Sequence, residues 1–215
     1  MQMLYKGIIF DLDGVICHTD KYHYKAWKKL ADQIGVYFDR TINNRLRGVS
    51  RMESLEIILE NYDGELTDDE KKTLAEQKNN YYRELLNNMS RADLSDEVYD
   101  TLIALRQAGC KLAIGSSSKN AGFILKKIGL GEFFDAVSDG NNISHSKPDP
   151  EVFLKAAEYI NLAPAECLVV EDAESGIEAA INGGFDSAAI GDAVNCGKAM
   201  YTLRSIEDLK EIVII

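Results

Sequence analysis

The sequence contains few cysteines, and they lie far apart. Cys17, Cys110, Cys167 and Cys196 form no close pair, so their spacing indicates neither a zinc site nor a disulfide framework. We expect four reduced thiols. The sequence also lacks an apolar stretch near the roughly 20 residues of a membrane-spanning helix, and its N-terminus lacks the basic and apolar segments of a signal peptide. These absences predict a cytoplasmic protein.

Basic residues are also fewer than acidic ones. The chain has 24 lysines and arginines against 35 aspartates and glutamates, which gives a formal net charge of −11. This charge repels phosphodiester backbones and anionic lipid surfaces, so we expect neither nucleic acid nor a membrane as a partner. The 215 residues, 46% of them hydrophobic, are enough for one large domain or for a core domain with a smaller companion.

Short apolar runs bounded by turn residues recur along the chain, with helical patterns between most of them. The runs lie at residues 5–10, 111–114, 136–137, 167–170 and 187–190. Strands that alternate with amphipathic helices indicate βαβ units. The sequence therefore predicts an α/β fold with a parallel sheet that is covered by helices on both faces.

The long segment after the first run has no convincing strand pattern. Its first helix carries four residues at helical spacing: His23, Trp27, Leu30 and Ile34. Residues 50–53 and 67–70 both match a capping box, which predicts that two more helices begin there. We interpret this segment as an all-helical cap that can open and close over the sheet. The predicted domains are residues 1–16 with 92–215 for the core and 17–91 for the cap.

Two carboxylates, Asp11 and Asp13, follow the first predicted strand directly. Open α/β sheets bind ligands at the carboxyl ends of their strands, and strand alternation separates Leu12 from its two neighbours. One carboxylate can attack a phosphoryl group while the other moves a proton, and Gly14 allows the backbone to approach closely. The alternative interpretation is a polar turn after a strand.

Three further strand or helix ends carry polar residues. Ser116 follows the second strand and precedes a helix, where hydroxyl and N–H groups can bind an anion; the alternative is that Ser118 only caps that helix. Lys147 precedes another helix and can pair with a phosphoryl oxygen, unless it is an idle surface lysine. Glu171 and Asp172 leave a buried strand, and Asp172 can join Asp11 in binding Mg²⁺, unless both belong to an acidic turn. Their convergence on one crevice favours the functional interpretations.

These residues resemble the four motifs of the haloacid dehalogenase superfamily. The resemblance rests on residues 11–15, Ser116, Lys147 and the pair Glu171 and Asp172, and it covers the whole chain. It implies a Rossmann-like core, an aspartyl-phosphate intermediate on Asp11 and acid/base work by Asp13. It also implies a metal site formed by Asp11, Asp13, Glu171 and Asp172, with Mg²⁺ held by Asp11, the Asp13 carbonyl and Asp172. Ser116 and Lys147 would hold the transferring phosphate.

Within that superfamily, the cap is similar to that of the β-phosphoglucomutases, on residues 22–27, 46–51 and 116–120. The resemblance implies that Thr19 and His23 serve the approach to the two aspartates and that Arg51 grips the phosphate that is not being transferred. It further implies a set of residues that bind the sugar phosphate or support closure: Trp27, Gly48, Val49, Ser50, Ser54, Lys78, Ser117 and Asn120. Without the resemblance, His23 and Trp27 would be a packed helix face, and Arg51 a solvated charge.

The sequence departs from this pattern at two places. It has Cys17-His18-Thr19 where these enzymes often have Thr-Asp-Thr, and Arg47 where they commonly have lysine. His18 could alter the hinge or proton traffic, and Arg47 keeps the charge but changes its geometry.

The function implied by the resemblance is the interconversion of β-D-glucose 1-phosphate and glucose 6-phosphate through β-glucose 1,6-bisphosphate. The expected partners are small-molecule sugar phosphates, and the expected state is a monomer. The alternative is a Mg²⁺-dependent sugar-phosphate phosphatase with the same core. A third hypothesis, from another class, is a phosphate-binding module without turnover, although such a module has no need of Asp13.

Overall fold

A computed structural model of the chain describes residues 4–47 and 49–214. It contains a six-stranded parallel sheet in the order β3-β2-β1-β4-β5-β6. The strands are β1 (Gly7–Phe10), β2 (Lys111–Gly115), β3 (Ala136–Ser138), β4 (Cys167–Glu171), β5 (Asp186–Ala189) and β6 (Tyr201–Thr202). The predicted fold class is thereby confirmed. The two-residue strand β6 has no apolar run and was not predicted.

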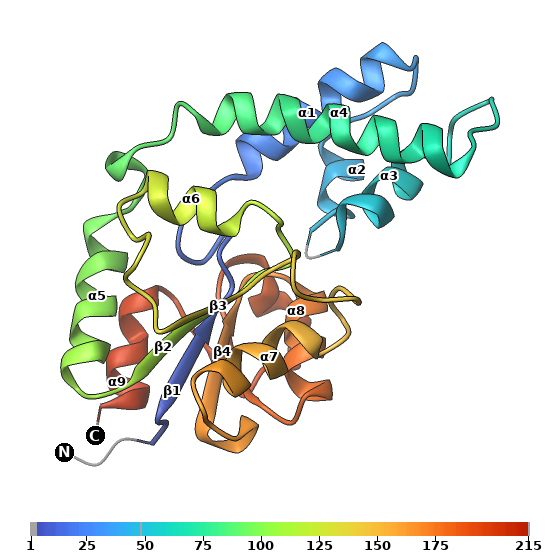
Figure 1. Cartoon of the computed structure of the whole chain (residues 1–215). Helices are drawn as coiled ribbons and strands as arrows, with labels where there is room; N and C mark the ends of the chain where they lie inside the picture. Colours follow the sequence, from blue (N-terminus) through green and yellow to red (C-terminus); the bar gives the residue numbers. More distant parts are fainter. Residues whose placement is uncertain (1–3, 48, 215) are drawn as a thin grey trace.

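Helices cover both faces of the sheet because side chains alternate along the buried strands. Ile8 and Phe10 pack on the side of α5 (Asp96–Gln107), α6 (Ala121–Lys127) and α9 (Leu209–Val213). Ile9 packs on the opposite side, against α7 (Glu151–Tyr159) and α8 (Glu174–Asn182). Figure 1 shows these two helical layers on either side of the strands. Continuous apolar strands therefore fit a sheet that is buried on both faces.

The predicted cap is present as four α-helices in the described residues between β1 and α5. They are α1 (Asp20–Gln33), α2 (Arg40–Asn44), α3 (Arg51–Leu59) and α4 (Asp68–Leu86). Both predicted capping boxes form, at the starts of α3 and α4. The cap has its own hydrophobic cluster around Trp27, Leu30 and Leu55. Its described residues contain no strand, as predicted, whereas the short helix α2 was not predicted.

The cap stands over the carboxyl ends of the strands, as Figure 1 shows. Tyr22 of α1 and Tyr82 of α4 join the hydrophobic cluster of the core, so the base of the cap packs on the sheet layer. This arrangement brings cap side chains opposite the loops that follow β1, β2 and β4. The functional groups predicted from the two parts of the sequence can therefore meet.

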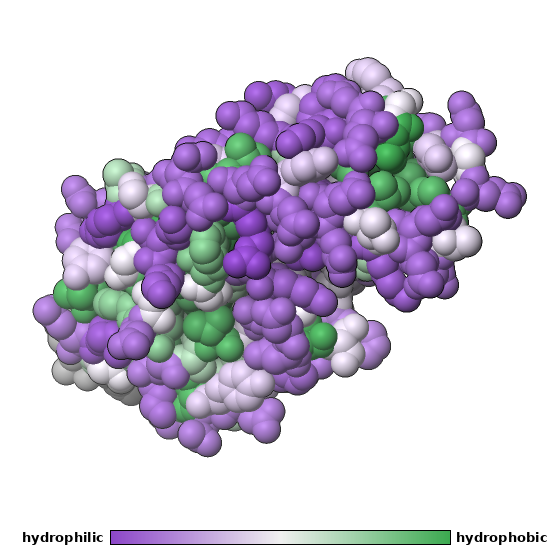
Figure 2. Space-filling view, turned by 45° about the horizontal axis from the view of Figure 1, so that its top comes forward, coloured by the Kyte–Doolittle hydropathy of each residue, from purple (hydrophilic) through white to green (hydrophobic). Residues whose placement is uncertain are grey.

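Three further features bear on the predictions made from composition: the surface, the length of apolar helices and the cysteines. On the face shown in Figure 2, hydrophobic residues form small patches separated by hydrophilic ones. In the described part of the chain, no helix is both long enough and apolar enough to span a membrane. Cys17, Cys110, Cys167 and Cys196 take part in no disulfide in the described part of the chain.

Candidate active site

A cavity of about 460 Å³ lies between the cap and the strand ends. This volume is within the range of small-molecule sites. Its lining includes nearly all the residues predicted for the site: Asp11, Asp13, His23, Trp27, Val49, Ser50, Arg51, Ser54, Lys78, Ser116, Ser117, Asn120, Lys147, Glu171 and Asp172. Thr19 is fully buried behind Asp13 instead, and the predicted Gly48 lies outside the described residues.

Lys147 is the central cation of the core side of the cavity. Its side chain is 1% exposed, and its Nζ donates to Asp11 Oδ1 at 2.5 Å and to Glu171 Oε1 at 2.6 Å. Burial alone would lower the pKa of Lys147, but the two carboxylates outweigh it and raise that pKa above its usual value. Lys147 therefore stays protonated and holds a fixed positive charge beside Asp11.

Three carboxyl groups at these strand ends have raised pKa values. Burial is the main cause for each: it raises the pKa of Asp11 to about 7, that of Asp13 to about 6 and that of Asp172 to about 8. Glu171 adds to the effect at Asp11 and Asp172, because like charges oppose ionisation. A cation bound here would stabilise the ionised carboxylates.

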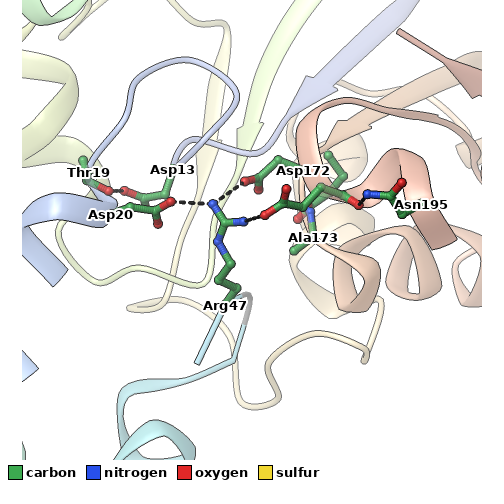
Figure 3. Close-up of polar contacts among 9 residues, drawn as sticks. Asp13, Thr19, Asp20, Arg47, Asp172, Ala173 and Asn195 are labelled. Carbon is green, nitrogen blue, oxygen red and sulfur yellow. Dashed lines mark hydrogen bonds and ion pairs between the residues drawn. The ribbon is translucent and has the colours of Figure 1, made fainter. Parts of the chain in front are cut away.

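Asp13 turns away from Lys147 toward the start of the cap. Its Oδ1 accepts a hydrogen bond from the Thr19 hydroxyl, and Thr19 immediately precedes α1 (Figure 3). Asp13 is thus tied to the segment that connects core and cap. A movement of this segment would change the direction in which the Asp13 carboxyl points.

The donor set at Asp11, Asp13 and Asp172 fits Mg²⁺. It offers two carboxylates and a backbone carbonyl, which are the oxygen ligands that this hard cation prefers. The Asp172 carboxylate also lies directly against the backbone of Gly14, where a Cβ would overlap it. The absence of a side chain at Gly14 therefore allows Asp172 to approach the loop that carries Asp11 and Asp13. Glu171 differs from these residues, because Lys147 and the Ala173 N–H already engage both of its oxygens.

Substitution of Gly14 by alanine is expected to disturb this arrangement. Gly14 has φ of +99° and its new Cβ would collide with Asp172 Oδ2, so both strain and overlap act together. We expect the free energy of unfolding to fall by about 1–3 kcal/mol and Mg²⁺ affinity to fall with it. Urea unfolding and calorimetric Mg²⁺ titration measure the two effects.

Gly122→Ala is the matched control, because a Cβ at Gly122 of α6 meets nothing within 4 Å. Its free energy of unfolding should be unchanged or higher by up to about 1 kcal/mol. Equal effects of the two substitutions would contradict the proposed role of the Gly14 backbone.

The loop after β2 is held by its own serines. Ser118 N–H donates to Ser116 Oγ at 3.2 Å, and Asn120 N–H donates to Ser118 Oγ at 3.2 Å. The Ser116 N–H donates to Ser138 O at 3.0 Å. These three backbone groups are thus engaged within the protein, while the Ser116 hydroxyl lines the cavity and retains a proton to donate. Ser118 therefore bonds within its own loop, but the N-cap residue of α6 is Asn120, so the alternative that Ser118 caps this helix is not the arrangement observed.

The cap side of the cavity carries a second group of basic residues. Lys78 is 3% exposed; its Nζ lies 3.0 Å from His23 Nδ1 and 4.5 Å from the centre of the Trp27 ring. Burial lowers the pKa values of both Lys78 and His23 well below their usual values; Lys78 adds to the effect at His23, and the positive charge of Arg51 adds to it at both. Among the described residues, neither Lys78 nor Arg51 forms an ion pair with a carboxylate. An anion bound there would relieve this unfavourable burial of positive charge.

Lys78→Met is expected to stabilise the protein near pH 7 while weakening the binding of sugar bisphosphates. In the wild type, the pKa of Lys78 is lower in the folded protein than its ordinary value of 10.5. Between these two pKa values the unfolded chain binds more protons than the folded protein does, so the free energy of unfolding rises with pH over this window. The variant lacks this rise, and it should be more stable at pH 7 by about 1 kcal/mol or more. Urea unfolding at pH 7 and at pH values approaching 10.5 measures the difference.

Lys72→Met on the same helix serves as the control, since Lys72 is 66% exposed and pairs with Asp69 on the surface. It should change stability by less than about 1 kcal/mol at either pH. A Lys78 variant that is less stable than the wild type at pH 7 would contradict the interpretation of Lys78 as an unpaired buried cation.

Polar contacts also join the cap to the core around the cavity. Asn120 Nδ2 donates to Asn79 Oδ1 at 2.9 Å, and Ser146 Oγ donates to Glu53 Oε2 at 2.8 Å. On another side, Arg47 of the cap contacts three carboxylates: that of Asp192, and those of Asp20 and Asp172, which Figure 3 labels.

Sequence reasoning missed some of these groups. Asp20 and Asn79 adjoin predicted site residues, and Asp192 follows a predicted strand, so the strand-end rule applied there would have pointed to it.

Comparison with known proteins agrees with this geometry. A protein-family model described as haloacid dehalogenase-like hydrolase matches residues 5–184. The chain belongs to this family. The predicted resemblance is confirmed, and the cavity at the strand ends is the candidate active site of a haloacid dehalogenase-like enzyme.

Relatives of this haloacid dehalogenase-like chain include both mutases and phosphatases. It is 39% identical to a β-phosphoglucomutase of Bacillus subtilis, over 95% of this chain and 91% of that one. It is 29% identical to a phosphorylated carbohydrates phosphatase of Thermotoga maritima, over 95% and 94% of the two chains. The crystal structure of a β-phosphoglucomutase from Clostridium difficile is similar to it, with a TM-score of 0.91, 38% identity and coverage of 96% and 93%.

Proposed function

We propose that this protein interconverts β-D-glucose 1-phosphate and glucose 6-phosphate through β-glucose 1,6-bisphosphate. One observation carries the proposal: the cavity has basic groups at both ends, Lys147 on the core and Lys78 with Arg51 on the cap. A bisphosphate needs an anion site at each end, whereas a single phosphate needs only one. The mutase and the crystal structure named above support the same substrate class.

In the proposed reaction, Asp11 carries the phosphoryl group and Asp13 moves the proton. Phosphorylated Asp11 donates its phosphoryl group to the 6-hydroxyl of β-glucose 1-phosphate, while Asp13 removes the hydroxyl proton. The bisphosphate then reorients, and Asp11 attacks its 1-phosphate. The proton on Asp13 passes to the leaving C1 oxygen, which releases glucose 6-phosphate and restores the aspartyl phosphate.

The neighbouring groups would support transfer in different ways. The raised pKa values of Lys147 and Asp13 suit a permanent cation and an acid/base group, respectively. The Ser116 hydroxyl would donate to a phosphoryl oxygen. Mg²⁺ held by Asp11, the Asp13 carbonyl and Asp172 would neutralise charge on the transferring phosphate. Glu171 would act through Lys147, which it holds at 2.6 Å.

The alternative is a sugar-phosphate phosphatase, in which water instead of the sugar accepts the phosphoryl group. The 29% identity to a phosphorylated carbohydrates phosphatase supports this alternative. The cap decides between the two outcomes, because water must be excluded from the aspartyl phosphate if it is to reach the sugar. The basic groups at the cap end of the cavity favour the mutase.

The test supplies the protein with Mg²⁺, β-glucose 1-phosphate and a trace of β-glucose 1,6-bisphosphate, and follows glucose 6-phosphate and free phosphate together. The proposal expects glucose 6-phosphate in large excess over phosphate, with a requirement for the bisphosphate. Phosphate in excess would identify a phosphatase. A binding module would form neither product, and its affinity would survive Asp13→Asn.

A further inference from the structure

Arg47 lies in the loop between α2 and α3, at the edge of the cap that faces the core. Its guanidinium contacts Asp20 at the start of α1 and reaches across to Asp172 at 3.4 Å (Figure 3). It also contacts Asp192. Asp20 belongs to the cap, whereas the other two carboxylates belong to the core. The Arg47 side chain is 24% exposed, so this contact is partly shielded from water.

The core presents Asp172 and Asp192 as one receptor for this guanidinium. Asp192 lies in the short helix η3 (Gly191–Cys196), which follows β5. The Ala193 N–H donates to Asp172 O at 3.0 Å, and Asn195 Nδ2 donates to Asp192 O at 3.4 Å. The first bond ties η3 to the backbone of Asp172, the second lies within η3, and Arg47 contacts both carboxylates. The Asp192 side chain is 77% exposed and makes no contact with the predicted metal ligands Asp11 and Asp13 in the described hydrogen bonds and ion pairs.

We propose that Asp192 is a positioning residue that docks Arg47 onto Asp172, so that cap docking and Mg²⁺ binding compete for Asp172. The inference rests on the metal site of the proposed function. Asp172 is a buried carboxylate that needs a positive charge nearby. Arg47 supplies this charge when the cap is docked, and Mg²⁺ would supply it instead when it binds. With both cations present and no phosphate, they repel each other.

This competition gives the substrate a specific role in closure. A transferring phosphate would place negative charge between Arg47 and Mg²⁺. The cap could then dock while Mg²⁺ is bound. By thermodynamic linkage, Mg²⁺ and cap docking must weaken each other by the same factor when substrate is absent. Because contacts through an exposed carboxylate are worth little in water, this factor is on the order of two- to fivefold.

Calorimetric titration of Mg²⁺ into the substrate-free protein tests the proposal through Asp192→Asn. Removal of an acidic charge near a cation site by itself weakens Mg²⁺ binding. The proposal expects the opposite result: the variant should bind Mg²⁺ about two- to fivefold more tightly, because Arg47 is held less firmly on Asp172. Weaker or unchanged binding would overturn it, and so would a wild type that binds no Mg²⁺.

Glu174→Gln is the matched control. It removes the same charge two residues from Asp172, but Glu174 pairs with Lys198 on the exposed surface of the core domain, and none of the described hydrogen bonds or ion pairs joins it to the cap. It should bind Mg²⁺ no more tightly than the wild type; tighter binding in this variant would also overturn the proposal.

Small-angle X-ray scattering gives the second readout. Mg²⁺ should enlarge the radius of gyration of the substrate-free wild type by opening the cap, and it should enlarge that of Asp192→Asn less. An equal response in the two proteins would contradict the linkage. Neither measurement uses a sugar phosphate, so failure of the glucose 6-phosphate assay with this linkage intact would overturn only the proposed substrate.

Discussion

Asp11→Asn should reduce the formation of glucose 6-phosphate by about 10⁴-fold or more, the scale seen when a nucleophile is removed. The amide cannot form the phosphoryl-enzyme intermediate, yet it has nearly the shape of the carboxylate and still offers Lys147 an oxygen at the position that lies 2.5 Å from its Nζ. The fold and the binding of sugar phosphate should therefore survive. Steady-state rates and the incorporation of labelled phosphate into the protein measure the two parts of this prediction.

Asp100→Asn is the control, since Asp100 is an exposed residue of α5 in the same core. It should keep wild-type activity and labelling. Retention of a labelled phosphoryl group by Asp11→Asn would place the covalent intermediate on another residue and contradict the proposed role of Asp11.

Lys147→Met should lower the free energy of unfolding by about 3–5 kcal/mol, the cost of breaking a buried ion pair from one side. Lys147 is 1% exposed and bonds both Asp11 and Glu171, so its loss leaves two buried carboxylates without their cation. The pKa of Asp11 should rise further, because the Lys147 charge now lowers it. Turnover should fall with stability, since the fixed charge next to the nucleophile is lost. Urea unfolding and assays at low temperature measure these effects.

Comparison with Lys6→Met separates the effect of burial on stability from the effect of contact distance. Lys6 bonds Glu166 at 2.6 Å, as short a contact as those of Lys147, but its side chain is 66% exposed. Its loss should leave the free energy of unfolding close to that of the wild type. A double variant, Lys147→Met with Glu171→Gln, should recover part of the lost stability. Equal losses for the two lysine variants would contradict the argument from burial.

Much of the site could be predicted because parallel strands share one carboxyl edge. Asp11, Ser116 and Asp172 each follow a strand that has a clear apolar run, and the sheet order places β1 between β2 and β4. Strand ends that are far apart in sequence therefore had to be neighbours. The starts of α3 and α4 could be predicted for a different reason, since a capping box is a local interaction within four residues.

Other features depend on contacts between segments that have no common sequence signal. Glu171 was predicted as a metal ligand beside Asp172, yet Lys147 and the Ala173 N–H engage its carboxylate. The loop after β2 was expected to offer free N–H groups, but its own hydroxyls accept two of them. Local competition for hydrogen bonds cannot be predicted from residue type alone, because it depends on the backbone angles that the surrounding fold imposes.

The sequence by itself determined the parallel sheet, the helical cap and the identity of the residues that approach the strand ends, because periodicity and caps are local properties. The tertiary structure alone decided how charges pair across the cavity. Lys147 lies between two carboxylates, Lys78 and Arg51 form no ion pair with a carboxylate of the described residues, and Arg47 joins the cap to Asp172 and Asp192. These pairings follow from distances of a few ångströms between distant segments. The strength of each charge interaction depends on that distance and on burial, and neither can be read from the order of residues.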